Sequence, residues 1–309
     1  MLLNWKKGES TYLDKSFVVI THYIKALHLV IAKILAVVGP AVGIGLLMAY
    51  NYFKKSAPRP ASAPEEIIPQ SEMIIRARKV LRMDCGIYYN IGICGSSGTG
   101  KSSFINCMRK IKDVKLTSEF RFQEDGPAPI GVSETTADCT RYSYPNNEAP
   151  YLRLWDIPGG GTAKHPAETY FADKLLYAFD CLIILYAGRF TKLDLDICKQ
   201  AYIYKIPVLL VRSKADIDVD IQKTMKVDEL DRSLTGKEYE QLIKETVDTL
   251  KHDVVQLLAT VPGCNHLTNL PVYVVAPQRY RSPRSNECPP LEMEQMLERC
   301  LTVAASGRR

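Results

Sequence analysis

The sequence lacks any C-x-x-C pair. Its nine cysteines are odd in number and scattered over 309 residues, which excludes a disulfide framework and a zinc ribbon. Several lie in apolar strand or helix patterns, where cysteine behaves as a small hydrophobic residue. The five histidines never fall at the spacing of metal ligands. These absences favour a protein of a reducing compartment, the cytosol.

Beyond residue 60 the chain has no surplus of charge. Residues 1–60 hold eight of the 40 Lys and Arg residues and two of the 34 Asp and Glu residues, a surplus of six that equals the net charge of the whole chain. A neutral body argues against a nucleic-acid-binding surface, whereas a basic arm beside apolar sequence fits anionic lipid. We therefore expect a lipid membrane, and no nucleic acid, among the partners.

Signals for lipid anchors and for cleavage are also missing. Leu2 stands where N-myristoylation requires glycine, and the chain ends in two arginines without a prenylation box. The apolar run 34–53 is too long, and lies too far from the first residue, to be a cleavable signal peptide. The segment after it, 56–64, is rich in proline and alanine and is typical of a stiff linker.

The most informative segment is residues 95–102, which have the form G-x-x-x-x-G-K-S. It follows the apolar run 88–94 and precedes a helical pattern, which is the context of a phosphate-binding loop. Glycines let backbone N–H groups turn toward phosphate oxygens, and the helix adds the positive end of its dipole. Lys101 is expected to reach the β- and γ-phosphates, and Ser102 to hold Mg²⁺. The residues predicted to bind nucleotide here are Gly95, Ser96, Ser97, Gly98, Thr99, Gly100, Lys101, Ser102 and Ser103.

The rest of the body alternates strand-length apolar runs with helical patterns. Strands are predicted at 88–94, 151–155, 181–186, 207–212 and 271–275. Helices are predicted directly after the loop, near 167–179, near 195–204, from the capping box of Thr235 and Glu238 toward 259, and near 291–303. Continuous apolar runs are typical of parallel strands buried on both faces. The pattern predicts an α/β fold with a doubly wound, mostly parallel sheet that binds ligand at the carboxyl ends of its strands.

Two short elements follow predicted strands. Asp156 and Gly159 form a D-x-x-G element, whose carboxylate can bind Mg²⁺ through water and whose glycine N–H can contact the γ-phosphate. Ser213, Lys214 and Asp216 are similar to the N/T-K-x-D element of GTPases, in which the aspartate accepts the N1–H and the 2-amino group of guanine. Either tetrapeptide alone is common, but their order and strand context favour guanine nucleotide binding.

Residues 126–147 are polar and contain a Glu-Thr-Thr sequence at 134–136. A switch loop needs one threonine that closes on Mg²⁺ and the γ-phosphate in the triphosphate state. Thr136 is predicted for that role, with Thr135 as the second candidate, and a simple turn cap is the competing interpretation of both. The predicted metal ligands are therefore Ser102, Thr136 and Asp156.

A run without charged residues, 34–53, lies between Lys33 and Lys54. It is just long enough to cross a hydrocarbon core of roughly 30 Å. A single span would carry five N-terminal lysines away from the cytosol, against the positive-inside bias. A hairpin that bends at Gly39 and Pro40 avoids this conflict. The run also fits close helix packing in the bilayer through Gly39 and Gly43, or a buried pair of helices in a helical subdomain.

These residues resemble the immunity-related GTPases, an interferon-inducible family related to dynamin-like GTPases. The similar stretches are 95–106, 131–136, 154–162, 168–171 and 189–196. The resemblance implies a P-loop NTPase with a Ras-like G domain, GTP hydrolysis to GDP with Mg²⁺, and homo-oligomers formed through G domains. It also implies action at an intracellular membrane with the G domain facing the cytosol.

The resulting domain prediction has four parts. Residues 1–55 form a helical, membrane-associated segment, 56–70 a linker, 71–280 the G domain, and 281–309 a short tail with one helix. Family members usually continue into a sizeable helical domain, whereas only 32 residues follow Pro277 here. The last loop, with Ala276, matches the S-A-K-like base-capping loop only loosely.

Catalysis is expected to depend on Lys101, Ser102 and Thr136. Gly160 stands where Ras-like enzymes carry a water-orienting glutamine, and no residue is an obvious general base. Slow intrinsic hydrolysis with activation by a second G domain is therefore expected. The rival interpretations are a membrane-anchored guanine-nucleotide scaffold with little hydrolysis, and a P-loop ATPase or kinase.

Overall fold

The computed structural model describes residues 70–117, 120–131, 138–145, 149–162, 165–284 and 287–306. Residues 68–309 form one compact unit. The predicted membrane segment, the linker up to residue 69, and both switch threonines, Thr135 and Thr136, lie outside the described residues. Within the described ranges, no helix combines the length and the apolar character that a membrane span requires.

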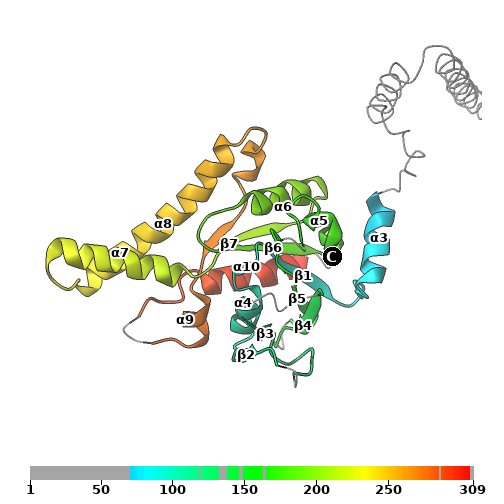
Figure 1. The fold of residues 1–309 in the computed structure, drawn as a ribbon, viewed down its shortest axis with the longest axis horizontal. Helices are drawn as coiled ribbons and strands as arrows, with labels where there is room; N and C mark the ends of the chain where they lie inside the picture. Colours follow the sequence, from blue (N-terminus) through cyan, green and yellow to red (C-terminus); the bar gives the residue numbers. More distant parts are fainter. Residues whose placement is uncertain are drawn as a thin grey trace, which may run out of the picture. The chain divides into compact units, whose positions relative to one another are not determined.

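A six-stranded sheet organises this unit, in the order β4-β5-β1-β6-β7-β8 (Figure 1). All neighbours pair in parallel except β4, which pairs antiparallel with β5 at one edge. The strands are β1 (Tyr89–Cys94), β4 (Thr140–Ser143), β5 (Leu152–Asp156), β6 (Cys181–Tyr186), β7 (Val208–Arg212) and β8 (Val272–Val274). Two short strands, β2 (Val114–Lys115) and β3 (Pro129–Ile130), form a separate parallel pair.

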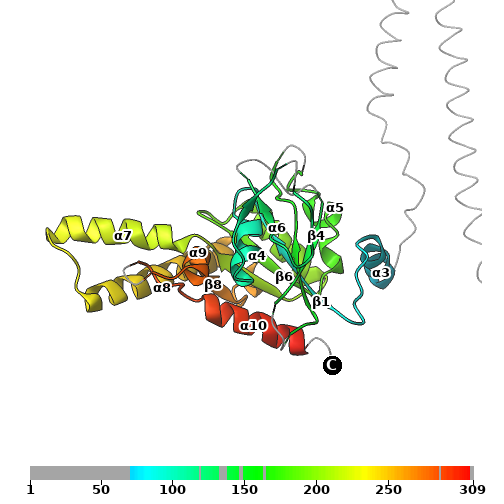
Figure 2. The ribbon, with the colours of Figure 1, turned by 90° about the horizontal axis from the view of Figure 1, so that it is seen from below.

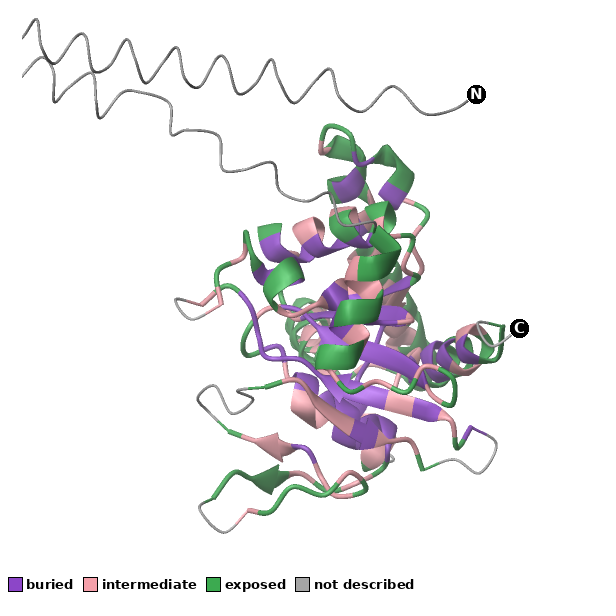
Figure 3. Cartoon of the chain, turned by 90° about the vertical axis from the view of Figure 1, so that its right-hand side faces the viewer, coloured by how far each residue is buried: buried purple, intermediate pink, exposed green. Residues whose placement is uncertain are grey.

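Helices cover both faces of the sheet. They are α3 (Gln70–Val80), α4 (Lys101–Met108), α5 (Tyr170–Asp173), α6 (Lys192–Ile203), α7 (Ala215–Leu230), α8 (Gly236–Thr260), α9 (Pro277–Arg281) and α10 (Met293–Ser306), with 3₁₀ turns η1 (Leu176–Ala178) and η2 (Asn265–Leu267). One core joins β1, β6 and β7 to α4 and α10, and the other joins the opposite faces of these strands to α5, α6 and α8. Figure 3 shows the central strands as buried.

The predicted strands and the doubly wound topology are confirmed. All five strands lie within one or two residues of their predicted ranges. The capping box of Thr235 and Glu238 is present at the start of α8. The helix predicted near 167–179 is wrong as a single helix, because Leu175 adopts a left-handed conformation, φ +52°, between α5 and η1.

Several elements of the fold were not predicted. They are helices α3, α7 and α9 and strands β2, β3 and β4, of which β3 and β4 lie inside the polar segment 126–147. The C-terminal helix α10 buries Met293, Met296 and Cys300 in the same core as β1 and β6. This helix matches the one predicted near 291–303.

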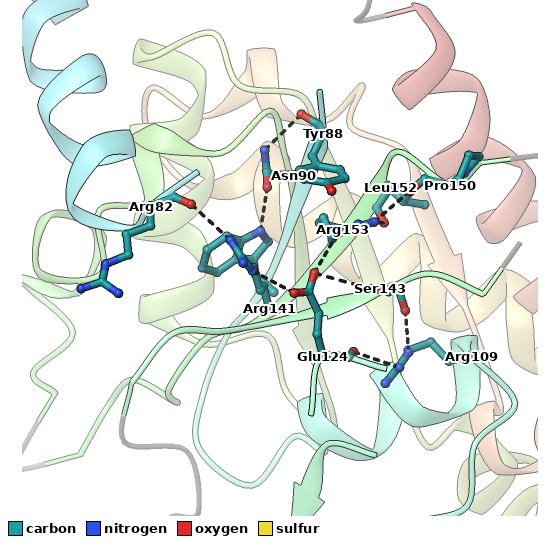
Figure 4. Close-up of polar contacts among 11 residues, drawn as sticks. Arg82, Tyr88, Asn90, Arg109, Glu124, Arg141, Ser143, Pro150, Leu152 and Arg153 are labelled. Atoms are coloured by element: carbon teal, nitrogen blue, oxygen red, sulfur yellow. Dashed lines mark hydrogen bonds and ion pairs between the residues drawn. The ribbon is translucent and has the colours of Figure 1, made fainter. Parts of the chain in front are cut away.

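The β4 edge is held by a charged network around Glu124 (Figure 4). Its carboxylate forms an ion pair with Arg153 Nε at 2.9 Å and accepts a hydrogen bond from Arg141 Nε at 3.3 Å. Arg109, directly after α4, donates to the carbonyls of Ser143 and Gly126 at 2.8 and 2.6 Å. These contacts fix the polar segment 120–131 to α4, β4 and β5.

All nine cysteines lie in the described ranges and are free thiols, and seven of them are buried. Burial raises the pKa of Cys139 to about 11 and that of Cys107 to about 12. Their thiols therefore stay protonated near neutral pH and pack as apolar groups.

Candidate nucleotide-binding site

Four segments meet at the carboxyl edge of the sheet. The loop 95–100 follows β1, Asp156 ends β5, Ser213 follows β7, and Ala276 follows β8. The register places Ile93 opposite Asp156, so the loop and the D-x-x-G element leave the sheet side by side. The motifs that the sequence placed after strands therefore converge on one site.

The loop conformation depends on glycine at its first position. Gly95 has φ +130°, and a Cβ there would lie 2.3 Å from the carbonyl oxygen of Leu185. Gly98 and Gly100 also have positive φ, at +80° and +90°. Helix α4 starts directly afterwards at Lys101, so its first N–H groups face the loop and can meet an anion.

Lys101 lies inside this loop. Its Nζ donates to the carbonyl oxygens of Ser96 at 2.8 Å and Gly95 at 3.3 Å. Only 7% of the residue is exposed. The ammonium group is thus held where phosphate oxygens would approach the loop N–H groups.

Ser102 and Asp156 form a close oxygen pair. The Ser102 hydroxyl donates to Asp156 Oδ2 at 2.6 Å, and Asp156 is almost fully buried. A hydroxyl and a carboxylate are oxygen ligands of the kind that Mg²⁺ prefers, with phosphate oxygens and water completing its octahedron. Among the described residues no cluster of three or more His, Cys, Asp and Glu side chains could hold a metal. The donor types of the Ser102–Asp156 pair suit a Mg²⁺ ion that is shared with a phosphate ligand.

The D-x-x-G element is bonded to the phosphate-binding loop. Ser97 N donates to Gly160 O at 3.1 Å, and Gly160 N donates to Gly95 O at 3.2 Å. A Cβ on Gly159 would lie 2.6 Å from Ser97 Cα and 3.0 Å from Lys101 Nζ. Gly159 therefore lies against the loop and beside the Lys101 ammonium.

Gly160 has no room for a side chain. A Cβ there would lie 2.6 Å from Tyr170 Cδ2 and 2.7 Å from Leu193 Cδ2. Tyr170 is fully buried, and its hydroxyl donates to Pro158 O at 2.7 Å. The missing glutamine is thus explained by packing: α5 and α6 fill the space that such a side chain would need.

Installing the missing glutamine should therefore not create a faster enzyme. We expect Gly160→Gln to lower the free energy of unfolding by about 1–3 kcal/mol through overpacking and to leave GTP turnover at or below that of the parent. Urea unfolding and a phosphate-release assay measure the two effects. Gly236→Gln is the matched control, because a Cβ on Gly236 meets no atom within 4 Å and its φ is not positive. Faster turnover in Gly160→Gln would contradict this account.

The segment Ser213–Asp216, which the sequence predicts to read the base, is hydrogen-bonded to the loop 95–100. Ser213 Oγ lies 3.1 Å from the carbonyl oxygen of Thr99 and 3.3 Å from that of Tyr186. Lys214 has φ +59°, and its Nζ donates to Gly98 O at 3.1 Å. Ser213 thus connects the segment after β7 to the loop 95–100, at the position where N/T-K-x-D elements carry asparagine or threonine.

Asp216 and Ala276 lie at the start of α7 and α9. Ala215 N donates to Val275 O at 3.2 Å, which packs the last loop against the base-reading element. The N–H of Ala276, however, donates to Pro290 O at 3.3 Å. Arg279 Nε lies 3.5 Å from Asp216 Oδ2. In this conformation Ala276 bounds the site without offering its N–H to a base.

The remaining loop side chains make contacts of their own. Thr99 Oγ1 donates to Ser96 O at 3.0 Å. Ser103 Oγ donates to Asp113 Oδ2 at 2.9 Å and accepts from Gln278 at 2.7 Å. A nucleotide contact of Ser103 would therefore come from its backbone N–H.

Sequence reasoning missed three residues beside the site: Thr191, Asp194 and Arg279. Ser96 Oγ lies 3.2 Å from Thr191 Oγ1, which donates to Asp194 Oδ2 at 2.7 Å. Burial raises the pKa of Asp194, while the hydrogen bonds from Thr191 lower it. The Thr-x-x-Asp spacing before an apolar run is a capping-box pattern, so it could have been recognised. Nothing in the sequence indicates the pairing of Arg279.

The family model of interferon-inducible GTPases (IIGP) matches residues 70–261. Interferon-inducible GTPase 1 of Mus musculus is 32% identical over 179 residues, which cover 55% of this chain and 41% of that protein. T-cell-specific guanine nucleotide triphosphate-binding protein 2 of Mus musculus is 28% identical over 194 residues, covering 63% of this chain and 42% of that protein. The chain thus spans less than half the length of these relatives.

Solved structures of GTP- and GDP-bound proteins also align. Translation elongation factor SelB of Methanococcus maripaludis, in complex with the GTP analogue GppNHp, matches at 13% identity and a TM-score of 0.37, covering 70% of this chain and 33% of SelB. Era of Aquifex aeolicus, bound to GDP·AlF4⁻, matches at 13% identity and a TM-score of 0.38, covering 70% of this chain and 56% of Era. These scores are low, and the fold assignment rests on the strand order.

Proposed function

Because the chain belongs to the interferon-inducible GTPase family, we propose that it binds GTP with Mg²⁺ and hydrolyses GTP to GDP. The observation that carries this proposal is the Ser102–Asp156 oxygen pair, with its 2.6 Å hydrogen bond, beside the Lys101 ammonium. The segment Ser213–Asp216, proposed to read the base, follows β7 at the same edge of the sheet.

Each residue has a chemical role in this proposal. Lys101 and the N–H groups of residues 98–102 stabilise negative charge on the transferring phosphoryl group. Ser102 and Asp156 hold Mg²⁺, which supplies further positive charge when bound. Thr136, outside the described residues, is proposed to complete the metal site in the triphosphate state. Asp216 accepts the N1–H and the 2-amino group of guanine.

Intrinsic turnover is proposed to be slow. Gly160 offers no side chain to orient water, and its surroundings are filled by Tyr170 and Leu193. We propose that a second G domain completes the site, so that homo-oligomers are the active form. We also propose action at an intracellular membrane, through residues 34–53, with the G domain in the cytosol. The basic character of residues 1–60 supports this location.

The test is GTP turnover by residues 65–309 over a wide range of protein concentrations. Specific activity that rises with concentration would support self-activation. Tight guanine nucleotide binding with flat, near-zero turnover would favour a second candidate function, a membrane-anchored guanine-nucleotide scaffold. The packing around Gly160 is the observation that favours this second candidate.

A further inference from the structure

Arg279 of α9 lies among three carboxylates. Its Nε is 3.5 Å from Asp216 Oδ2, its Nη2 is 3.9 Å from Asp220 Oδ2, and its Nη1 pairs with Glu287. About 20% of the arginine side chain is exposed. Asp216 and Asp220 stand one turn apart on α7, and Glu287 precedes α10. The Arg279 guanidinium thus connects α9 to the start of α7 and to the chain before α10.

The contact with Asp216 leaves that carboxylate able to bind a ligand. A separation of 3.5 Å is longer than an N–H···O hydrogen bond, so the oxygen's lone pairs are not used by Arg279. Guanine needs both carboxylate oxygens, one for N1–H and one for the 2-amino group. The Arg279 guanidinium, at the side of the carboxylate, restricts the rotation of the carboxylate without occupying those positions.

Arg279 is itself fixed from the other side. Glu287 pairs with its Nη1, and the more exposed Asp220 adds a longer ion pair with its Nη2. The exposed fraction of the Asp216 side chain is only 18%. Buried or half-buried charge pairs depend on geometry more than exposed pairs do. The orientation of Asp216 therefore depends on a residue that belongs to none of the nucleotide motifs.

We propose that Arg279 is a positioning residue for guanine: it holds the Asp216 carboxylate so that both oxygens face the base, and so sets the preference for guanine over hypoxanthine. This inference rests on the proposed function, in which Asp216 reads guanine. Hypoxanthine keeps N1–H but lacks the 2-amino group, so the ratio of GDP to IDP affinity measures whether the second hydrogen bond is made.

The experiment uses the full chain and measures the dissociation constants of GDP, IDP and ADP. Arg279→Ala should weaken GDP binding about tenfold, close to the value of one hydrogen bond to a charged group, and should weaken IDP binding much less. Arg279→Lys should restore most of the GDP/IDP ratio. Asp220→Asn, which removes one anchor of Arg279 and touches no base, should lower the ratio by a smaller factor and covers the case in which Arg279→Ala does not fold.

Arg281→Ala is the matched control. Arg281 lies on the same helix and is similarly buried, but its Nη1 pairs with Asp113 Oδ1 at 2.8 Å. Its removal should leave the GDP/IDP ratio unchanged even if stability falls.

An unchanged ratio in both Arg279→Ala and Asp220→Asn, or tighter GDP binding in Arg279→Ala, would overturn the positioning role. Asp216→Asn separates this failure from failure of the proposed function. If Asp216→Asn abolishes the preference for guanine while Arg279→Ala leaves it intact, only the inference about Arg279 falls. If Asp216→Asn retains the preference, the base-reading assignment falls, and the inference falls with it.

Discussion

Lys101→Ala is expected to lower GTP turnover by about 10²–10³-fold, as the loss of one preorganised donor to a reacting oxyanion does. Its ammonium group is buried in the loop and is positioned by the carbonyls of Ser96 and Gly95. Nucleotide affinity should fall as well, because the same charge meets the β- and γ-phosphates before the reaction. Phosphate release and nucleotide titration measure the two effects.

Lys112→Ala is the control for this substitution. Lys112 is an exposed lysine in the loop after α4, so its removal changes the net charge equally without entering the site. The free energies of unfolding of the two variants should agree within about 0.5 kcal/mol if Lys101 acts on phosphate and not on the fold. Equal turnover in Lys101→Ala and the parent would mean that the loop is not the site of hydrolysis.

Asp156→Asn is expected to raise the Mg²⁺ concentration for half-maximal turnover by about 10–100-fold, the usual cost of losing a partner in the outer shell of a metal. The Ser102 hydroxyl donates to Asp156 at 2.6 Å, and an asparagine oxygen can still accept that bond. The substitution therefore removes the charge that attracts the metal and keeps the local packing. A Mg²⁺ titration of turnover at saturating GTP makes the measurement.

Asp173→Asn provides a charge-matched control, because Asp173 is exposed on α5 and its carboxylate accepts from Thr169 on the same helix turn. Its Mg²⁺ dependence should equal that of the parent. If Asp156→Asn also shows the parent's Mg²⁺ dependence, the Ser102–Asp156 pair does not bind the metal, and the pair would be a structural hydrogen bond.

The sequence predicts best the parts of this fold that depend on short-range patterns. The loop 95–100 follows β1 and Asp156 ends β5, and the geometry of both depends on neighbours in the chain, so both lie at the carboxyl ends of predicted strands. The buried strands β6 and β7 are continuous apolar runs for the same reason. Helix α7 was missed because it buries only Ala215 and Val219. Its sequence therefore lacks the regular spacing of apolar residues that predicts a helix.

Other features depend on contacts between distant segments. The sequence indicates that Gly160 lacks a glutamine, but only the packing of Tyr170 and Leu193 explains why none fits. Arg279 could not be identified because its partners come from α7 and from the chain before α10. Strand β4 escaped detection because it is an edge strand with one buried residue, Tyr142, in a polar segment. The assignment of Thr136 stays a prediction.

The position of α7 has a mechanical consequence. The helix begins at the base-reading element and runs outward with the first half of α8, away from the sheet (Figure 2). At 1.5 Å per residue its 16 residues span about 24 Å. A tilt of about 10° at Ala215 would therefore displace the Leu230 end by about 4 Å. If Asp216 reads guanine as proposed, the hairpin of α7 and α8 would act as a lever that pivots beside the base, and a small rearrangement around Asp216 would become a large displacement at the Leu230 end.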